Sequence, residues 1–158
     1  EAEALTQAAR RSGLRQKALN LLTSKPMSRR ELERKLESWE AAPEEATAIC
    51  GRLEELGFLN DALYAEQVVR HYSAKGYGLR KLRDELYRRG VPRAFWAEAM
   101  DGVSQGANVL DELLIRRLRG AEPTQENLKR ACDYLARRGF SWEEIAQAVE
   151  RYRCQGEE

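Results

Sequence analysis

The 158-residue sequence predicts an all-α protein, and three observations support this fold class. Apolar residues recur at three- and four-residue spacing along almost the whole chain, which is the period of amphipathic helices. The alternation of apolar and polar residues that is typical of strands is absent. Serine caps and glycine or proline breaks divide the chain into segments of helix length. We therefore expect short helices joined by tight turns.

The first group of helices is expected at 14–58, after an N-terminal stretch that frays. Its first helix ends before Pro26. Ser28 and Glu31 predict a capping box, in which their side chains satisfy backbone N–H groups at a helix start. A third helix opens near Pro43, because proline is tolerated in the first turn. The residues expected to be buried are Leu14, Ala18, Leu21, Leu22, Leu32, Leu36, Trp39, Ala46, Ile49, Leu53 and Leu56.

The second group is expected at 60–102, beginning with a helix that Asn60 or Asp61 can cap. A basic helix over 78–89 follows, and Gly90 ends it by adopting a left-handed conformation. The residues expected to be buried are Ala65, Val68, Val69, Tyr72, Leu79, Leu82, Leu86, Trp96, Met100 and Val103.

The third group is expected at 107–153, after a break at 102–106. Pro123 and Thr124 separate its first two helices. Ser141 and Glu144 predict a second capping box before the last helix. The residues expected to be buried are Leu110, Leu113, Leu114, Leu118, Leu128, Ala131, Cys132, Leu135, Trp142, Ile145, Ala146 and Val149.

An internal repeat relates these groups. The segments 88–91 and 137–140 both close a helix with Arg-Arg-Gly and an apolar residue. The period is about 50 residues, which is typical of helical repeat arrays. Because three short helices bury only a small core, neighbouring repeats are expected to stabilise one another. We therefore predict three tandem three-helix repeats, 14–58, 60–102 and 107–153, in an elongated, curved array.

Catalytic and metal-binding patterns are missing from the sequence. His71 is the only histidine, and the glycines of 76–78 lack the third glycine and preceding strand of a dinucleotide site. Cys50, Cys132 and Cys154 have no CxxC spacing, so neither a zinc site nor a disulfide framework is indicated. We expect no enzyme activity, no cofactor and no metal, and a reducing, cytoplasmic location. No apolar run approaches the roughly 18 residues that span a bilayer.

Positive charge is concentrated in one stretch. Lys and Arg number 27 against 26 Asp and Glu, so the formal net charge of +1 says little about partners. Within 75–93, however, seven cations face only Asp84 and Glu85. These acids predict Arg80–Asp84, Lys81–Glu85 and Asp84–Arg88 pairs on a solvated helix face. Since other cations of the stretch are left without local partners, we favour a binding face.

This binding face contains the candidate site residues. Tyr77 and Tyr87 flank the basic helix, where they can stack on bases or simply pack against apolar neighbours. Three further basic clusters are Arg29, Arg30, Arg34 and Lys35; Arg116, Arg117 and Arg119; and Lys129, Arg130, Arg137 and Arg138. The candidate binding residues are Lys75, Tyr77, Arg80, Lys81, Arg83, Arg88, Arg89 and Arg93, with Arg29, Arg30, Lys129 and Arg130 as secondary members.

Two segments together resemble the bacterial RecX regulators of the RecA recombinase. One is the junction at 56–65, Leu-Gly-Phe-Leu-Asn-Asp-x-x-Tyr-Ala. The other is Lys-Gly-Tyr-Gly at 75–78, followed by Leu82, Leu86 and Arg-Gly-Val at 89–91. The resemblance covers about 14–153, and the first unit and last helix match more loosely.

The resemblance implies a modulator without catalytic activity. Such a protein binds the RecA filament, within the groove where DNA also lies, and restrains ATP hydrolysis, strand exchange and co-protease activity in DNA repair and the SOS response. The implied partners are the RecA filament and single- and double-stranded DNA, bound without sequence specificity. We expect a monomer and no membrane association.

Two other classes stay open at this stage. The basic helix at 78–89 is compatible with a freestanding helix-turn-helix DNA-binding protein, although it lacks the Asn or Gln that read bases. A helical-repeat scaffold that binds only protein is the second. Salt-dependent binding to bare DNA argues against the scaffold, and strong sequence preference argues against the RecX resemblance.

Overall fold

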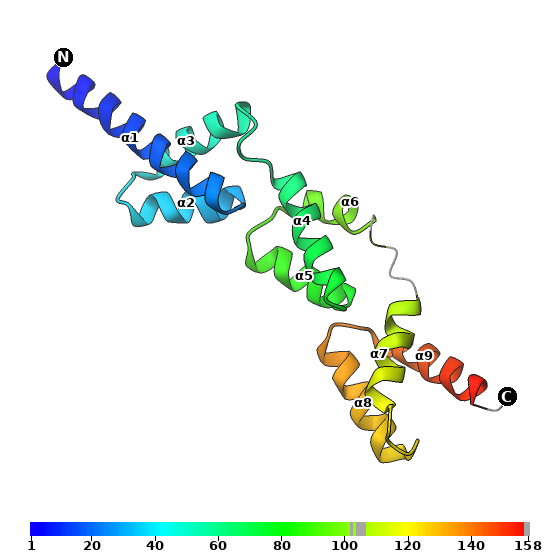
Figure 1. The fold of residues 1–158 in the computed structure, drawn as a ribbon. Coiled ribbons are helices and arrows are strands. Elements are labelled where there is room, and N and C mark those ends of the chain that lie inside the picture. The colour runs from blue at the N-terminus through cyan, green and yellow to red at the C-terminus, as the bar shows by residue number, and fades with distance from the viewer. Residues whose placement is uncertain (102, 104–106, 157–158) are drawn as a thin grey trace. The chain divides into compact units, whose positions relative to one another are not determined.

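The structure is a computed structural model that describes residues 1–101, 103 and 107–156. Over these residues it contains helices and turns without any strand, which confirms the all-α prediction (Figure 1). The predicted break at 102–106 lies outside the described residues, apart from Val103. The elements are α1 (Ala2–Ser24), α2 (Arg29–Ser38), α3 (Pro43–Glu55), α4 (Asp61–Ala74), α5 (Leu79–Arg88), a 3-10 turn (Arg93–Phe95), α6 (Trp96–Asp101), α7 (Ala107–Leu118), α8 (Gln125–Arg137) and α9 (Trp142–Gln155).

The chain divides into two compact units. The N-terminal unit comprises Glu1–Glu66 and Leu86–Trp96, and the C-terminal unit comprises Gln67–Glu85 and Ala97–Glu158. Helices α4 and α5 are therefore shared between the units. Since the segment 60–102 does not form a unit of its own here, the division into three repeats stays a prediction.

Helices α1, α2 and α3 pack around the core of the N-terminal unit (Figure 1). The Ser28 capping box is present in both directions and fixes the start of α2. Helix α1 begins at Ala2 instead of fraying before Leu14, because the preceding residues are mostly good helix formers. The core consists of Ala18, Leu32, Leu36, Ala41, Ala46, Ile49, Cys50, Leu53 and Leu59.

The prediction that Leu56 is buried is wrong, because the side chain is 48% exposed. The cause is the turn that ends α3, where Gly57 adopts φ +82°. The N–H groups of Phe58 and Leu59 both return to the carbonyl of Leu53. This reversal places Leu59 in the core in the position that the helical period assigns to Leu56.

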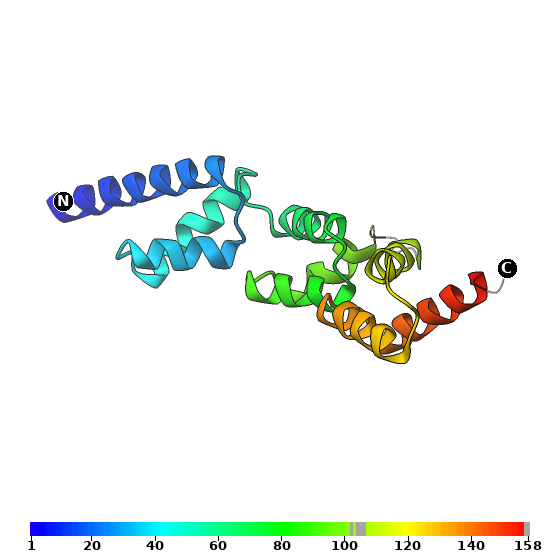
Figure 2. The same ribbon diagram turned by 60° about the horizontal axis from the view of Figure 1, so that its bottom comes forward.

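Helices α7, α8 and α9 pack around a second core in the C-terminal unit (Figure 2). The Ser141 side chain caps α9 by accepting from the N–H of Glu144, as one half of the predicted capping box requires. The Glu144 carboxylate accepts from the Ser141 hydroxyl instead of from its backbone N–H. Trp142 and Ala146 are exposed, against the prediction. Phe140, just before the helix, fills the core at that end, so the buried face of α9 starts at Ile145 and leaves Trp142 outside. The core consists of Leu110, Leu114, Leu118, Leu128, Ala131, Leu135, Phe140, Ile145 and Ala148.

Asn60 and Asp61 were both predicted as possible caps of α4, and the structure gives them different roles. The Asn60 side chain accepts from the N–H of Leu63 and is the cap. The Asp61 side chain instead accepts from the N–H of Arg29, at the start of α2. The junction between the first two groups is therefore tied to the N-terminus of α2 through a bond that the sequence pattern does not indicate.

Candidate functional site

The start of the basic helix α5 docks against the turn that follows α8. The N–H of Gly78 donates to the carbonyl of Arg138 over 2.8 Å, and the N–H of Arg80 donates to that of Gly139 over 3.1 Å. These bonds satisfy backbone donors that the first turn of a helix leaves free. We call this contact, formed by Gly78, Arg80, Lys81, Arg138 and Gly139, the α5–α8 joint.

Both glycines of the α5–α8 joint are required by close backbone approach. A Cβ atom on Gly78 would lie 2.5 Å from the carbonyl carbon of Gly139. Gly139 has φ +99°, and its Cβ would lie 2.6 Å from the backbone nitrogen of Lys81. The neighbouring atoms belong to the backbone and cannot rotate away. Glycine at both positions therefore lets two segments that are far apart in sequence come into direct contact.

The side chain of Arg138 also stabilises the α5–α8 joint. Its guanidinium donates to the carbonyls of Lys75 and Gly76. It also stacks on Tyr77, 4.2 Å from the ring centroid, and lies 5.6 Å from the Tyr134 centroid. Cation–π contacts of this kind stabilise a joint when partly shielded from water. The half-buried Tyr77 therefore packs within the joint, and its face is covered by Arg138.

The first Arg-Arg-Gly segment forms an equivalent joint in the N-terminal unit. The hydroxyl of Ser28 donates to the carbonyl of Arg89, 61 residues away. Gly90 has φ +74°, and its Cβ would lie 2.6 Å from the Cβ of Arg30. The separation of 61 residues in sequence between Ser28 and Arg89 also separates Gly78 from Gly139. The internal repeat in the sequence thus corresponds to two similar contacts, each joining a helix start to an Arg-Gly turn.

Two of the candidate cations are engaged inside the N-terminal unit. Arg89 donates to the hydroxyl of Tyr64 over 2.8 Å, and that hydroxyl donates to Glu31 over 2.8 Å. Arg29 pairs with Glu33 over 2.9 Å and with Glu54 over 2.8 Å. Both arginines are half-buried. Their contacts hold α2, α3 and α4 together.

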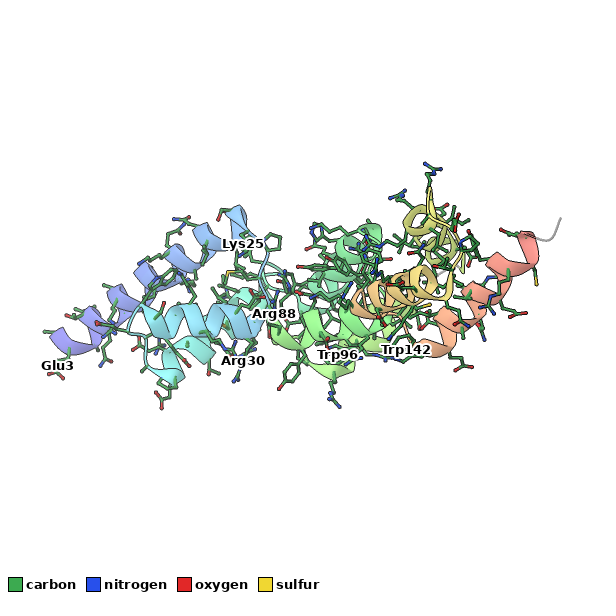
Figure 3. All side chains as sticks on the ribbon, turned by 90° about the horizontal axis from the view of Figure 1, so that it is seen from below. Glu3, Lys25, Arg30, Arg88, Trp96 and Trp142 are labelled. Carbon is green, nitrogen blue, oxygen red and sulfur yellow. The ribbon has the colours of Figure 1, made fainter. Side chains whose placement is uncertain are left out.

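The other candidate cations are mostly exposed. Lys81 is half-buried and pairs with the buried Glu85 over 3.4 Å, so this predicted pair is confirmed. Arg30 on α2 projects from the surface (Figure 3). Arg130 pairs with Glu126 on α8 over 2.9 Å, and Arg93 lies 5.5 Å from the ring centroid of Trp96. The exposed members of the predicted set are Arg30, Lys75, Arg80, Arg83, Arg88, Arg93, Lys129 and Arg130.

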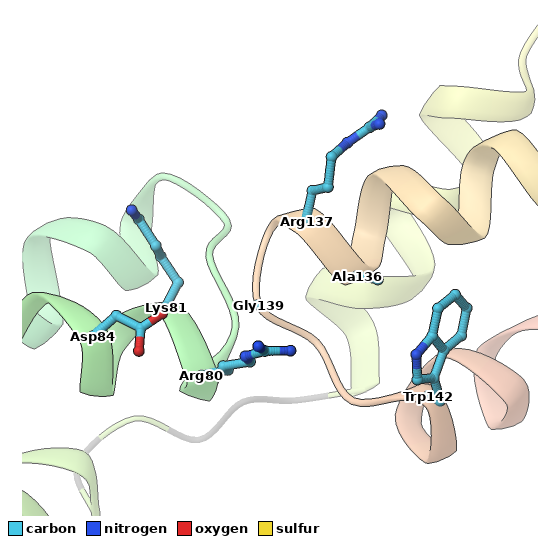
Figure 4. Close-up of a pocket in the computed structure, with 7 residues that line it drawn as sticks. All are labelled: Arg80, Lys81, Asp84, Ala136, Arg137, Gly139 and Trp142. Atoms are coloured by element: carbon cyan, nitrogen blue, oxygen red, sulfur yellow. The ribbon is translucent and has the colours of Figure 1, made fainter.

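A cavity of about 440 Å³ adjoins the α5–α8 joint (Figure 4). Arg80 and Lys81 are among the binding residues predicted from sequence, whereas Trp142 was predicted to be buried. The exposed position of this tryptophan follows from Phe140, whose burial is set by packing and not by helical period. The lining residues are Arg80, Lys81, Asp84, Ala136, Arg137, Gly139 and Trp142.

Burial strongly raises the pKa values of a thiol and a phenol in the N-terminal unit. Desolvation raises the pKa of the Cys50 thiol from 9.0 to about 12. Desolvation also raises the pKa of Tyr64 to about 12, against the bond from Arg89, which lowers it. Both groups are therefore held in their neutral forms. A free thiol of this kind is a core residue and not a nucleophile.

We expect the protein to lose stability in alkali. Because the folded pKa values of Cys50 and Tyr64 lie above their ordinary values of 9.0 and 10.0, their contribution is complete below about pH 9 and is lost as the pH rises towards about 12. Thermal melting between pH 8 and pH 11 under reducing conditions measures this loss. Cys50→Ala should make the decline shallower, whereas Cys154→Ala, which removes an exposed thiol, should leave it unchanged. An equal decline in both variants would contradict the assignment to Cys50.

The described residues offer no cluster of three or more His, Cys, Asp or Glu side chains that could hold a metal ion. The single histidine, His71, is exposed on α4 and lies edge to face with Tyr72, 5.1 Å between centroids. In the described part of the chain, helices long and apolar enough to cross a membrane are also absent.

The fold and the joints define a class of all-α protein in which short helices dock through Arg-Gly turns and a cationic helix is left exposed. Two family models match the chain, described as RecX, first three-helix domain, over residues 15–53, and RecX, second three-helix domain, over residues 60–100. The regulatory protein RecX of Stenotrophomonas maltophilia strain K279a is 38% identical over 136 residues, with 85% of this chain and 83% of the relative covered. That of Chromohalobacter salexigens is 35% identical over 138 residues, with 85% and 90% covered. The chain belongs to the RecX family of regulatory proteins.

Solved structures agree with this assignment at the level of the fold. The crystal structure of RecX from Lactobacillus salivarius superposes with a TM-score of 0.77 at 23% identity, covering 91% of this chain and 97% of that one. A second crystal structure, of a regulatory protein RecX, superposes with a TM-score of 0.83 at 18% identity, covering 94% of this chain and 76% of that one.

Proposed function

We propose that this protein binds the RecA nucleoprotein filament and restrains its ATPase, recombinase and co-protease activities. Membership of the RecX family carries the proposal, because the resemblance to that family implies RecA as the partner. The exposed cations of α5 support it, since a local positive field attracts the phosphates of filament DNA or acidic protein surfaces. The activity requires neither a cofactor nor a catalytic group, and a monomer in the cytoplasm suffices.

The mechanism we propose is differential binding. A ligand shifts an equilibrium only by its preference for one state over another. The protein restrains the filament by binding the blocked, capped or disassembling state more tightly than the active one. Binding by several repeats at once increases this preference when the added contacts are made in the restrained state and not in the active one.

The two joints support a repeat architecture for this function. Each joins the start of a middle helix to the Arg-Gly turn after the next middle helix, once from α2 and once from α5. Contacts repeated in this way are typical of arrays in which each repeat stabilises its neighbour. We therefore retain three tandem three-helix repeats, 14–58, 60–102 and 107–153, as part of the proposal.

RecA-dependent ATP hydrolysis on single-stranded DNA tests the proposed function. We expect the wild-type protein to inhibit hydrolysis, and Arg80→Ala/Arg83→Ala to inhibit about 10-fold less well, because two exposed cations of α5 are removed. Arg89 is left unchanged in this variant, since its bond to Tyr64 would confound binding with stability.

Arg11→Ala/Arg15→Ala is the matched control, because it removes the same charge from exposed positions on α1 outside the candidate site. It should inhibit like the wild type. Absence of inhibition by the wild-type protein would refute the proposed function. Equal inhibition by the α5 variant and the control would remove α5 from the site while leaving the function in place.

A further inference from the structure

The cavity beside the α5–α8 joint combines an exposed indole with positive charge. Trp142 is 61% exposed at the first position of α9. A single exposed aromatic residue is common on protein surfaces and has no meaning alone. Here, however, it shares the wall of a cavity of about 440 Å³ with Arg80 and Arg137. Figure 4 shows the Arg80 side chain extending from α5 towards the side on which Trp142 stands.

The charge of the lining is one-sided. Arg80 and Arg137 are both exposed, and Lys81 is partly neutralised by Glu85. Among the described residues of the lining, Asp84 is the single carboxylate. The cavity therefore favours an anionic ligand. Its aromatic wall favours one that also presents a flat, apolar face.

The backbone of the joint fixes the positions from which these side chains project before any ligand binds. The N–H of Arg80 is bonded to the carbonyl of Gly139, and Ser141 caps α9 directly before Trp142. Only the short segment after Gly139 separates that bond from the indole. A preorganised site loses less conformational entropy on binding than a flexible one.

We propose that this cavity, which we call the Trp142 groove, binds single-stranded nucleic acid. One base stacks on the indole of Trp142, and the neighbouring phosphates lie against Arg80 and Arg137. Stacking on an aromatic side chain requires an unpaired base, because the faces of bases in a duplex are already stacked on one another. An acidic protein segment satisfies the arginines but leaves the indole unused. The inference builds on the proposed function by assigning DNA contact within the filament to a defined site.

The test measures binding of a fluorescently labelled oligothymidylate by anisotropy, without RecA. We expect Trp142→Ala to weaken binding about 10-fold, as loss of one stacked base does. Trp142→Phe, which keeps an aromatic face, should recover most of the affinity. Phe58→Ala is the matched control, because Phe58 is 51% exposed in the turn after α3 and does not line the groove. It should bind like the wild type.

Two further experiments distinguish the contribution of base stacking from that of the phosphate contacts. An abasic oligonucleotide should bind the wild type and Trp142→Ala equally. Arg80→Ala/Arg137→Ala should flatten the dependence of affinity on salt by a slope of about 1.4, since each phosphate contact on a single strand contributes about 0.7. Arg70→Ala/Arg153→Ala, which removes two exposed cations elsewhere in the same unit, should not change the slope.

The outcomes distinguish this inference from the proposed function. Unchanged oligonucleotide binding by Trp142→Ala overturns the groove, even where inhibition of RecA is intact. Weakened binding of the abasic strand by Trp142→Ala also overturns it, because stacking is then not the contact. If Trp142→Ala binds the oligonucleotide normally but no longer binds RecA in the absence of DNA, the groove belongs to a protein partner instead. A groove that binds as expected in a protein that does not inhibit RecA supports the inference and refutes the proposed function.

Discussion

Gly139→Ala is expected to destabilise the protein by about 3 kcal/mol, because the new methyl group meets two separate penalties. The left-handed backbone at φ +99° costs an alanine about 1–2 kcal/mol. Its Cβ would also lie 2.6 Å from the backbone nitrogen of Lys81, and overpacking of this kind costs about 1–3 kcal/mol. Urea unfolding followed by circular dichroism measures the change in the free energy of unfolding.

Two other glycines separate these penalties. Gly120 has φ +78° with nothing within 4 Å of its Cβ position, so Gly120→Ala reports backbone strain alone. A Cβ on Gly78 would lie 2.5 Å from the Gly139 carbonyl, so Gly78→Ala reports crowding at the joint. The loss for Gly139→Ala should exceed the loss for Gly120→Ala by about 1–3 kcal/mol. Equal losses would show that α5 and the turn after α8 do not approach as closely as the structure indicates.

Residue Glu40 shows that a left-handed turn alone does not demand glycine. It follows α2 with φ 66°, at a position like that of Gly90 after α5, yet it carries an exposed side chain. At Gly90, by contrast, a Cβ would collide with Arg30. The glycine of the Arg-Gly turn is therefore required where another helix start docks against it.

Leu82→Asp should destabilise the protein by more than about 4 kcal/mol, because it removes a fully buried side chain and puts a carboxylate in its place. Loss of a buried leucine alone costs about 2–5 kcal/mol. The cost of the charge adds to it, and protonation at low pH should recover part of the loss. Thermal melting monitored by circular dichroism at pH 7 and pH 4 is the measurement.

The neighbouring substitution Arg83→Asp is the matched control. Arg83 is exposed, so the same carboxylate remains in water there and the melting temperature should change little. This pair tests the phase of α5 directly. Native-like melting of Leu82→Asp, or equal destabilisation by both substitutions, would show that Leu82 does not face the core.

Much of the secondary structure and part of the core follow from sequence because their causes are local. The caps at Ser28 and Ser141 depend on residues within one turn of a helix. The buried faces at Leu82 and Leu86 depend on the helical period. Leu56 and Trp142 departed from that period because each lies at a helix end, where a turn brings Leu59 or Phe140 into the core instead.

The candidate site likewise contains some features that are predictable from local sequence and others that depend on tertiary contacts. The concentration of positive charge over 75–93 identified Arg80 and Arg83 as candidate binding residues, and both are exposed. Charge density could not distinguish them from Arg29 and Arg89, whose partners Glu54 and Tyr64 lie far away in sequence. Recognition of such pairs requires knowing which helices touch.

The sequence by itself determined an all-α chain of short helices, an Arg-Arg-Gly repeat and a basic helix between two glycine turns, because helix period, capping and turn chemistry act within a few residues. Its motifs also indicated the RecX family, which the comparisons confirmed. Only the tertiary structure decided that the repeated glycines are contact points between distant segments, that two of the arginines are structural and that Trp142 is exposed beside Arg80. These features depend on contacts between residues 25 to 61 positions apart, and local spacing carries no information about such contacts.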